Sequence, residues 1–149
     1  MALSAKTHYN TRARSQQSYV VENAAVIYHG ALVGLDIVTG RLQPWNSDSV
    51  SLKFRGVATP QDDSVTGVAG TTVECPVDEG GMILHNVGVT GASAQANVGD
   101  LVYATDDNTL TLTATTNVGA IGEVVRYITG TSCDVRLWTP AEYRAQEDS

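Results

Sequence analysis

Cysteine and histidine are the residue types in this chain best suited to nucleophilic catalysis or metal binding. The two cysteines, Cys75 and Cys133, each fall inside a predicted strand, without Cys-x-x-Cys spacing or a neighbouring histidine. We therefore expect buried, reduced thiols. The three histidines, His8, His29 and His85, show neither His-x-His nor His-Glu-x-x-His spacing, which disfavours a metal site. Because catalytic triads assemble from residues distant in sequence, local spacing leaves that class of enzyme open.

Two acidic pairs and two glycine clusters are the remaining candidates for binding ions or phosphate. Asp62-Asp63 and Asp106-Asp107 are not followed by the alternating oxygen ligands and closing Glu of a calcium loop. The glycine clusters at 67–70 and 88–91 lack the strand-loop-helix setting and the Lys of a phosphate-binding loop. We expect solvated turns at all four places, no cofactor and no enzymatic activity. The loop 106–108 should be closed by hydrogen bonds from side chain to backbone.

The few large aromatic residues are expected to be architectural. Trp45, Trp138 and the single Phe, Phe54, lie at or near predicted strands and would seal the ends of a barrel or sandwich. The alternative is that one Trp is an exposed anchor at a protein interface, where aromatic residues are enriched. The alternation at 109–113 predicts either a half-buried strand or an edge that awaits a neighbouring subunit.

Length and composition favour one ordinary all-β domain. The chain has 149 residues and a net charge of −7, Val and Thr are abundant, and Gly or Asx-Gly turns recur at short intervals. These features predict a small barrel or sandwich.

No apolar run approaches the roughly 20 residues that span a bilayer, and residues 1–18 lack the apolar centre of a signal peptide. We expect the chain to be cytosolic when made and to have no membrane partner. The expected strands are residues 20–36 as strand, turn and strand, then Leu52 to Ala58, Thr71 to Pro76, Met82 to Val89, Leu101 to Thr105, Thr109 to Thr113, Ile121 to Ile128 and Asp134 to Trp138.

The two ends of the chain differ from this body, taken as residues 20–138. At the C-terminal end, 139–149, Thr139 is a predicted N-cap, Pro140 fits the first helical position and Glu142 the first turn, so one or two helical turns should form there.

Residues 1–19 show no periodicity and are expected to be a flexible arm. This arm is either a frayed terminus or a segment that orders on a partner.

Charge is segregated between this arm and the body. The arm holds three basic residues and no acid, which leaves six basic and sixteen acidic residues for the rest of the chain. Tyr9 and Tyr19 could anchor the arm on a partner surface while its cations orient it. Nucleic acid is disfavoured as the partner because the acidic body would be repelled by phosphate. The basic residues of the arm are Lys6, Arg12 and Arg14.

Short motifs in the first half resemble the lambda-type head decoration proteins of tailed bacteriophages. They are Thr7-His8-Tyr9 in the arm, Leu35-Asp36 before Leu42 and Trp45 across a glycine turn, and Gly56-Val57-Ala58 with an acidic loop. The second half is similar to the broader family of phage capsid cement proteins. Its motifs are Gly99-Asp100-Leu101-Val102-Tyr103, the acidic turn 106–108, Ile121-Gly122-Glu123-Val124 and Val135-Arg136-Leu137. The segment after Trp138 has no counterpart in this pattern.

This resemblance implies a barrel-like, β-tulip-like body and a structural role in a virion. The expected partners are the major capsid protein and the chain itself, as homotrimers at three-fold and quasi-three-fold positions on the outer surface of an expanded head. The residues expected to bind the capsid are Lys6, Thr7, His8, Tyr9, Arg12, Arg14 and Tyr19. The expected structural motif residues are Leu35, Asp36, Trp45, Gly99, Asp100, Tyr103, Ile121, Gly122 and Trp138.

Two other classes of protein remain as alternatives to a capsid decoration protein. A carbohydrate-binding β-sandwich could use Trp45, Trp138 and the tyrosines as a stacking platform for host surface glycans. A small β-barrel enzyme would need a polar pocket with converging titratable groups.

Overall fold

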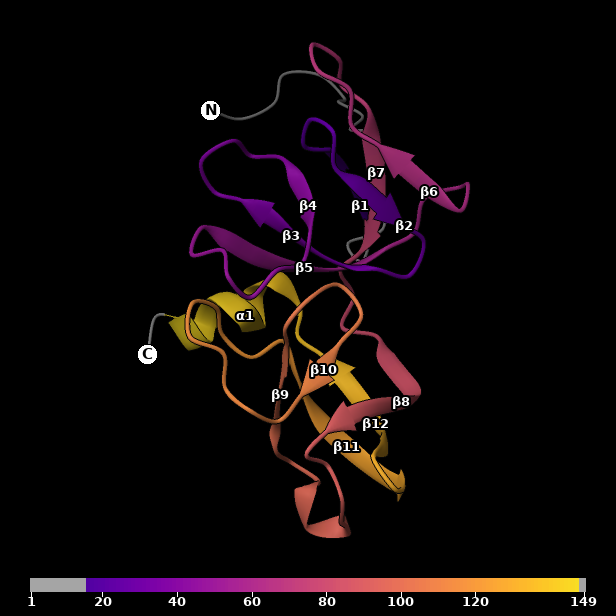
Figure 1. The fold of residues 1–149 in the computed structure, drawn as a ribbon, viewed down its shortest axis with the longest axis vertical. Helices are drawn as coiled ribbons and strands as arrows, with labels where there is room; N and C mark the ends of the chain where they lie inside the picture. The colour runs from indigo at the N-terminus through magenta and orange to yellow at the C-terminus, as the bar shows by residue number, and fades with distance from the viewer. Residues whose placement is uncertain (1–15, 148–149) are drawn as a thin grey trace, which may run out of the picture.

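The computed structural model describes residues 16–147 and confirms an all-β fold with one short helix at its C-terminal end. The strands form two units, one above the other in Figure 1. The upper unit is an open five-stranded sheet, accompanied by a ribbon of β2 (Val26–Tyr28) and β6 (Ser64–Thr66). The strands of the five-stranded sheet are, in spatial order, β1 (Gln16–Val20), β7 (Glu74–Asp78), β5 (Leu52–Ala58), β3 (Leu32–Asp36) and β4 (Leu42–Pro44).

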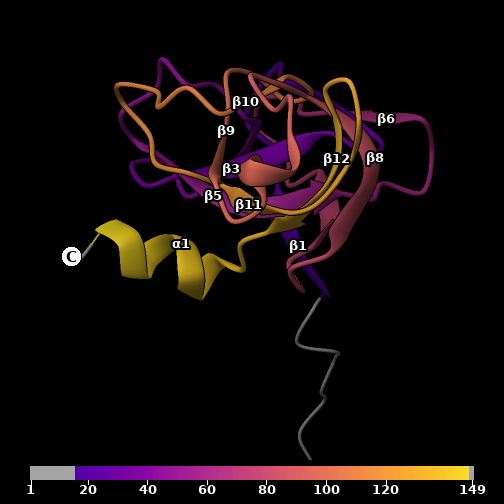
Figure 2. The same ribbon diagram turned by 90° about the horizontal axis from the view of Figure 1, so that it is seen from below.

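The lower unit is a closed five-stranded barrel. A short 3-10 helix, Gln95–Asn97, lies between two of its strands in the sequence. The helix α1 (Pro140–Glu147) follows the last strand and lies on the side of the molecule opposite β10 (Figure 2). The barrel strands are, in spatial order, β10 (Leu110–Thr111), β8 (Ile83–Thr90), β12 (Ser132–Leu137), β11 (Gly122–Thr129) and β9 (Leu101–Ala104).

The two units share one strand topology, which no sequence pattern predicted. We number the five strands of each unit from first to fifth in chain order. In the upper sheet they are β1, β3, β4, β5 and β7. In the barrel they are β8, β9, β10, β11 and β12. The spatial order is first, fifth, fourth, second, third in both, with antiparallel neighbours throughout. In the barrel, β10 closes the ring by parallel pairing of Leu110 with Val89. In the upper sheet, one parallel bridge between Val21 and Leu42 stands in the same place. The fold therefore repeats one five-stranded topology twice.

Individual residues match between the two units. Cys75 pairs with Tyr19, two residues before the bridging Val21, and Cys133 pairs with a residue two before the bridging Val89. Gly56 and Gly122 both lie where a Cβ would collide with a backbone oxygen of the fifth strand, at 2.1 Å from Asp78 O and 2.4 Å from Arg136 O. Glycine is therefore required at both places because the fourth and fifth strands approach closely there.

The hydrophobic core joins the two units. Its larger cluster contains Trp45, Phe54 and Leu52 of the upper unit together with residues of all five barrel strands and Tyr143 of α1. A smaller cluster fills the upper sheet alone and includes Val33, Leu42 and Cys75. Because apolar burial is the main favourable term in folding, the shared cluster makes the two units one body.

The structure confirms most of the predicted strands, corrects the boundary of the predicted arm and decides one open alternative. Residues 16–19 are not part of a flexible arm: they pair with β7, and the ring of Tyr19 packs against the core of the upper sheet. The alternating run at 109–113 is not a free edge, since β10 pairs with β8 on one side and β9 on the other. The range 20–36 contains two short strands separated by a turn, β2 and β3, as predicted, whereas β6 was not predicted.

The predicted helix α1 is present with its expected cap. The hydroxyl of Thr139 accepts the N–H of Glu142 at 3.2 Å, and the carboxylate of Glu142 accepts the N–H of Thr139 at 3.0 Å. This is a reciprocal capping box. The N–H of Thr139 lowers the pKa of Glu142, and the Arg136 guanidinium contributes in the same direction.

Candidate functional site

Both thiols are buried and reduced, as the sequence predicts. Neither Cys75 nor Cys133 has any exposed surface. Burial raises the pKa of the Cys75 thiol to about 11 and also raises the pKa of Cys133. Because the thiolate is the nucleophile, these two residues are poorly suited to covalent chemistry.

We expect the folded protein to resist thiol reagents at pH 8, whereas protein unfolded in denaturant should react with two equivalents. The thiols lack both access and thiolate character in the native state. A raised pKa also means that the native state favours the neutral thiol, so this contribution to stability is complete below the unfolded value near 9 and falls as pH rises towards 11. Absorbance after addition of an aromatic disulfide reagent measures the reaction. Fast reaction of one native thiol would contradict the prediction.

The described histidines make isolated structural contacts. The Nδ1 of His29 lies 2.9 Å from the carbonyl oxygen of Pro60. The Nδ1 of His85 lies 2.7 Å from an Asp134 carboxylate oxygen, which also accepts the N–H of Asn86 at 2.9 Å. That N–H, more than the imidazole, lowers the pKa of Asp134. Residues 16–147 hold no group of three or more His, Cys, Asp and Glu side chains placed to bind a metal.

The acidic loop between β9 and β10 is closed as predicted, by a side chain and a backbone amide. The carboxylate of Asp106 accepts the N–H of Asn108 at 3.0 Å, which lowers its pKa. The neighbouring Asp107 has a raised pKa because it is partly buried and faces the charge of Asp106. Its backbone oxygen accepts the N–H of Leu32 at 2.9 Å, so this loop of the barrel is fixed to the upper unit.

Tyr19, predicted to anchor an arm on a partner, lies instead in a cluster of polar side chains within the chain itself. Its hydroxyl donates to Glu79, and Arg55 donates both to that hydroxyl, at 2.7 Å, and to Glu79, at 2.9 Å. Burial is the largest cause of the raised pKa of Tyr19. Glu79 belongs to the segment that joins the two units, so the cluster fixes β1 to this connection. No local sequence pattern marks it, because its members are far apart in the chain.

Trp45 is an internal residue, and it seals the contact between the two units. It is 1% exposed, its ring packs edge-on against Phe54 and Tyr143, and its indole N–H donates to the Ala104 carbonyl at 2.9 Å. Trp138 is half-buried, with the guanidinium of Arg136 4.9 Å from its ring centroid. A stacking platform that uses both Trp residues therefore cannot form in the folded chain.

The residues of the motifs quoted from the sequence lie in turns, at the ends of strands or within strands. Leu35 and Asp36 end β3, and the carboxylate of Asp36 accepts the N–H of Val38 at 2.7 Å in the turn that follows. The remaining motif residues lie beside or inside barrel strands: Gly99 donates to the Val124 carbonyl at 2.8 Å, Asp100 accepts from Asn97, Tyr103 lies in β9, Ile121 is buried and Gly122 begins β11. The predicted capsid-binding residues Lys6, Thr7, His8, Tyr9, Arg12 and Arg14 lie outside the described residues.

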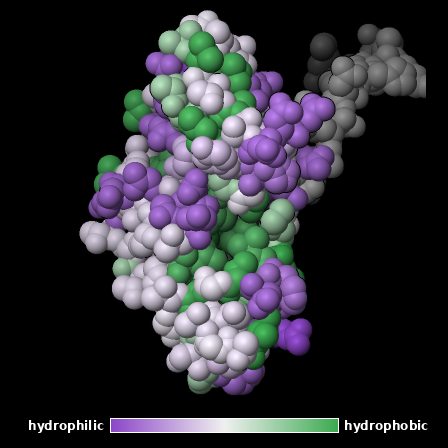
Figure 3. Space-filling model, turned by 45° about the vertical axis from the view of Figure 1, so that its right-hand side comes forward, coloured by the Kyte–Doolittle hydropathy of each residue, from purple (hydrophilic) through white to green (hydrophobic). Residues whose placement is uncertain are grey.

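One hollow lies between the two units, and we call it the junction groove. Its volume is about 320 Å³. Figure 3 shows apolar surface at this waist with hydrophilic side chains on its borders. The floor is Leu32, Leu84, Val87 and Leu110, and the rim includes Asp107 and Asn108.

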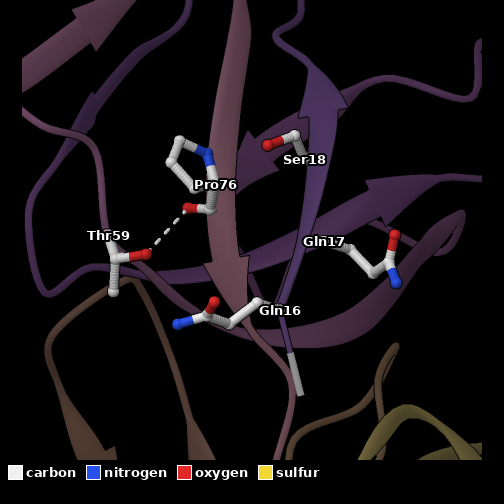
Figure 4. Close-up of a pocket in the computed structure, with 5 residues that line it drawn as sticks. All are labelled: Gln16, Gln17, Ser18, Thr59 and Pro76. Carbon is white, nitrogen blue, oxygen red and sulfur yellow. Dashed lines mark hydrogen bonds between the residues drawn. The ribbon is translucent and has the colours of Figure 1, made fainter. Parts of the chain in front are cut away.

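A second hollow, of about 460 Å³, lies over β1 and β7. Figure 4 shows its lining side chains: Gln16, Gln17, Ser18, Thr59 and Pro76, with the Thr59 hydroxyl directed at the Pro76 carbonyl. This lining contains amides and hydroxyls but no titratable side chain. It offers hydrogen bonds without an acid, a base or a nucleophile, so it is suited to binding and not to proton transfer.

No family model, curated protein or solved structure matches this chain. Within residues 16–147, no helix has the length and apolar character needed to cross a membrane.

Proposed function

We propose that this protein is a capsid decoration, or cement, protein that binds as trimers at three-fold and quasi-three-fold positions of an expanded icosahedral phage head. It would stabilise the head by holding neighbouring subunits of the major capsid protein together on the outer surface of the virion. The segments that resemble the cement family carry this proposal. They begin β9 and β11 and lie within β12 of one closed barrel, so the order that suggests the family is also a compact structural unit.

The distribution of charge supports a binding role for the N-terminal residues. Residues 1–15 contain three basic side chains and no acid, whereas residues 16–147 contain six basic and fifteen acidic side chains. Three of the six cations, Lys53, Arg55 and Arg136, are engaged in ion pairs with the body's own acids. The N-terminal cations are thus the part of the chain best suited to an acidic partner surface.

The mechanism requires binding energy alone. An extended N-terminal segment can add to a sheet edge of a capsid subunit, where backbone hydrogen bonds give affinity and alternate side chains give fit. Three such segments on one trimer raise the effective concentration of each, so dissociation is slow even when each contact is weak. Binding to the assembled shell and not to free capsid subunits stabilises the shell by mass action.

The test is co-sedimentation of the full chain with expanded, undecorated heads of its source virus. We expect saturable binding near one copy per capsid subunit, and little binding to unexpanded shells. The variant Lys6→Gln/Arg12→Gln/Arg14→Gln should lower occupancy at least tenfold, since three charge contacts of about 0.5 kcal/mol on each of three arms act together.

A matched variant, Arg41→Gln/Arg126→Gln/Arg144→Gln, removes three cations from the body and should leave occupancy within twofold of the unmodified chain. Equal losses in both variants would mean that net charge alone governs attachment. Absence of binding by the unmodified chain would reject the proposed function.

A further inference from the structure

The junction groove has the features of a docking site for an extended peptide segment. Its floor of four Leu and Val side chains is formed by both units: Leu32 belongs to β3, Leu84 and Val87 to β8, and Leu110 to β10. The groove therefore exists only because the two units are packed together. Its lining contains no cationic side chain, and its rim carries Asp107.

One wall of the groove is a strand edge without a partner. β10 pairs with β8 only at Val89 and Thr90, and no other described strand pairs with the earlier part of β8 on that side. The N–H of Val89 bonds to Thr131 on the β12 side, whereas the carbonyl of Thr90 accepts from Leu112 on the β10 side. Because backbone groups alternate along a strand, the N–H of Gly88 points to the β10 side and lines the groove, whereas its carbonyl is the acceptor that the parallel pairing of Val89 with Leu110 uses. An extended segment could pair with this N–H.

The border of the groove is acidic. Asp106 and Asp107 lie in the loop on one side. His29, next to the groove residue Gly30, donates its backbone N–H to the carbonyl of Asp63 at 2.8 Å, which holds the acidic pair 62–63 close to the same border. A segment that fits must therefore combine apolar or aromatic side chains for the floor with cations for the rim and carry no acid.

We propose that residues 7–14 of a second copy of this chain dock in the junction groove. This segment, Thr-His-Tyr-Asn-Thr-Arg-Ala-Arg, supplies an aromatic ring for the floor, two guanidinium groups for the acidic rim and no carboxylate. Arginine is well suited to such contacts, because its planar head pairs with carboxylates in two hydrogen bonds. Fully extended, eight residues span about 27 Å, enough to cover the groove and reach past its rim.

The position of the chain's entry into the body favours exchange between copies. The chain enters β1 on the side of the molecule that carries α1, whereas β10, at the groove, lies on the opposite side (Figure 2). Within the upper sheet, Gln16 is separated from the groove residue Leu32 by β7 and β5, because Gln16 pairs with Asp78, Asp78 with Val57 and Val57 with Leu32. A segment that docks in its own groove would have to cross these two strands. Docking of each copy's segment on the next copy is a head-to-tail contact, and such contacts form a ring when the rotation between copies closes and an open filament when it does not.

This inference goes beyond the proposed function and does not depend on it. It names a contact between copies of the chain that forms in the absence of a capsid. A shell and the groove would compete for the same residues, and the experiment below contains no shell, so the two proposals can fail separately.

The test uses the full chain with Tyr9 replaced by the photoreactive residue p-benzoylphenylalanine. Copies labelled with heavy nitrogen are mixed with unlabelled copies and irradiated, and the cross-linked peptides are identified by mass spectrometry. We expect adducts between residue 9 and the segments 84–88 or 106–110, with heavy and light peptides joined in the same adduct. Adducts joined only within one copy, or located away from these two segments, would overturn the proposal.

A paired comparison tests the charge contacts. The variant Asp106→Asn/Asp107→Asn keeps an oxygen that can accept the N–H of Asn108 but removes two negative charges. It should lower the yield of adducts about fivefold, as expected for two ion pairs of moderate strength. The control Glu74→Gln/Asp100→Asn removes two exposed charges away from the groove and should leave the yield unchanged. Equal yields from all three proteins would overturn the proposal.

The oligomeric state of the unmodified chain provides a second measurement. In sedimentation equilibrium at low salt, we expect the full chain to associate, and Asp106→Asn/Asp107→Asn to shift the equilibrium towards monomer. Native circular dichroism of the variant verifies that it is folded. A monomeric full chain at all concentrations up to those used for cross-linking would contradict the exchange between copies.

Discussion

Gly56→Ala should lower the free energy of unfolding by roughly 3 kcal/mol or more, the range seen when a side chain is forced against fixed backbone. Gly56 has a φ of +138°, which alanine rarely adopts, and an added Cβ would lie 2.1 Å from the Asp78 carbonyl oxygen. That oxygen belongs to β7, the neighbouring strand of the sheet. The two strands would have to separate, and their hydrogen bonds would be lost. Urea denaturation followed by circular dichroism measures the change.

Two further glycine variants separate the two causes. Gly40→Ala places alanine at a φ of +71° with open space around it, so only the backbone conformation is strained, at a cost of about 1 kcal/mol. Gly122→Ala introduces a Cβ 2.4 Å from Arg136 O without a positive φ, so only the collision acts. We expect Gly40→Ala to cost least and Gly56→Ala most. A Gly56→Ala protein as stable as Gly40→Ala would show that the two strands are not in close contact at this position.

Trp45→Ala should cost about 3–5 kcal/mol, the usual effect of removing a large buried aromatic side chain. The ring fills the contact between the two units against Phe54 and Tyr143, and its N–H satisfies the Ala104 carbonyl of the barrel. Truncation leaves both a cavity and a buried carbonyl without its partner. Because the shared core joins the two units, we also expect thermal unfolding of this variant to separate into two transitions, where the unmodified protein shows one.

Scanning calorimetry measures both effects, and two variants serve as comparisons. Trp45→Phe keeps most of the apolar contact but loses the hydrogen bond, so its loss of stability should lie between those of the parent and Trp45→Ala. Trp138→Ala removes a half-buried indole that stacks with Arg136, and it should cost less than half as much. A loss below about 1.5 kcal/mol for Trp45→Ala would contradict the role of Trp45 as the central contact between the units.

Several local features of this protein follow from the sequence alone. The all-β class follows from the abundance of Val and Thr and the short intervals between turns, because these features act within a few residues. The cap of α1 needs only Thr139 and Glu142, and the loop at 106–108 needs only Asp106 and Asn108. The burial of Cys75 and Cys133 also follows from their position inside apolar strands.

Only the tertiary structure decided which strands are neighbours and where the polar side chains meet. The repetition of the five-stranded topology leaves no clear repeat in the sequence, because alternating burial constrains the pattern of residues more than their identity. The cluster of Tyr19, Arg55 and Glu79 joins positions from three separate segments. The junction groove likewise requires both units. Contacts of this kind depend on chain topology, and no spacing along the sequence encodes them locally.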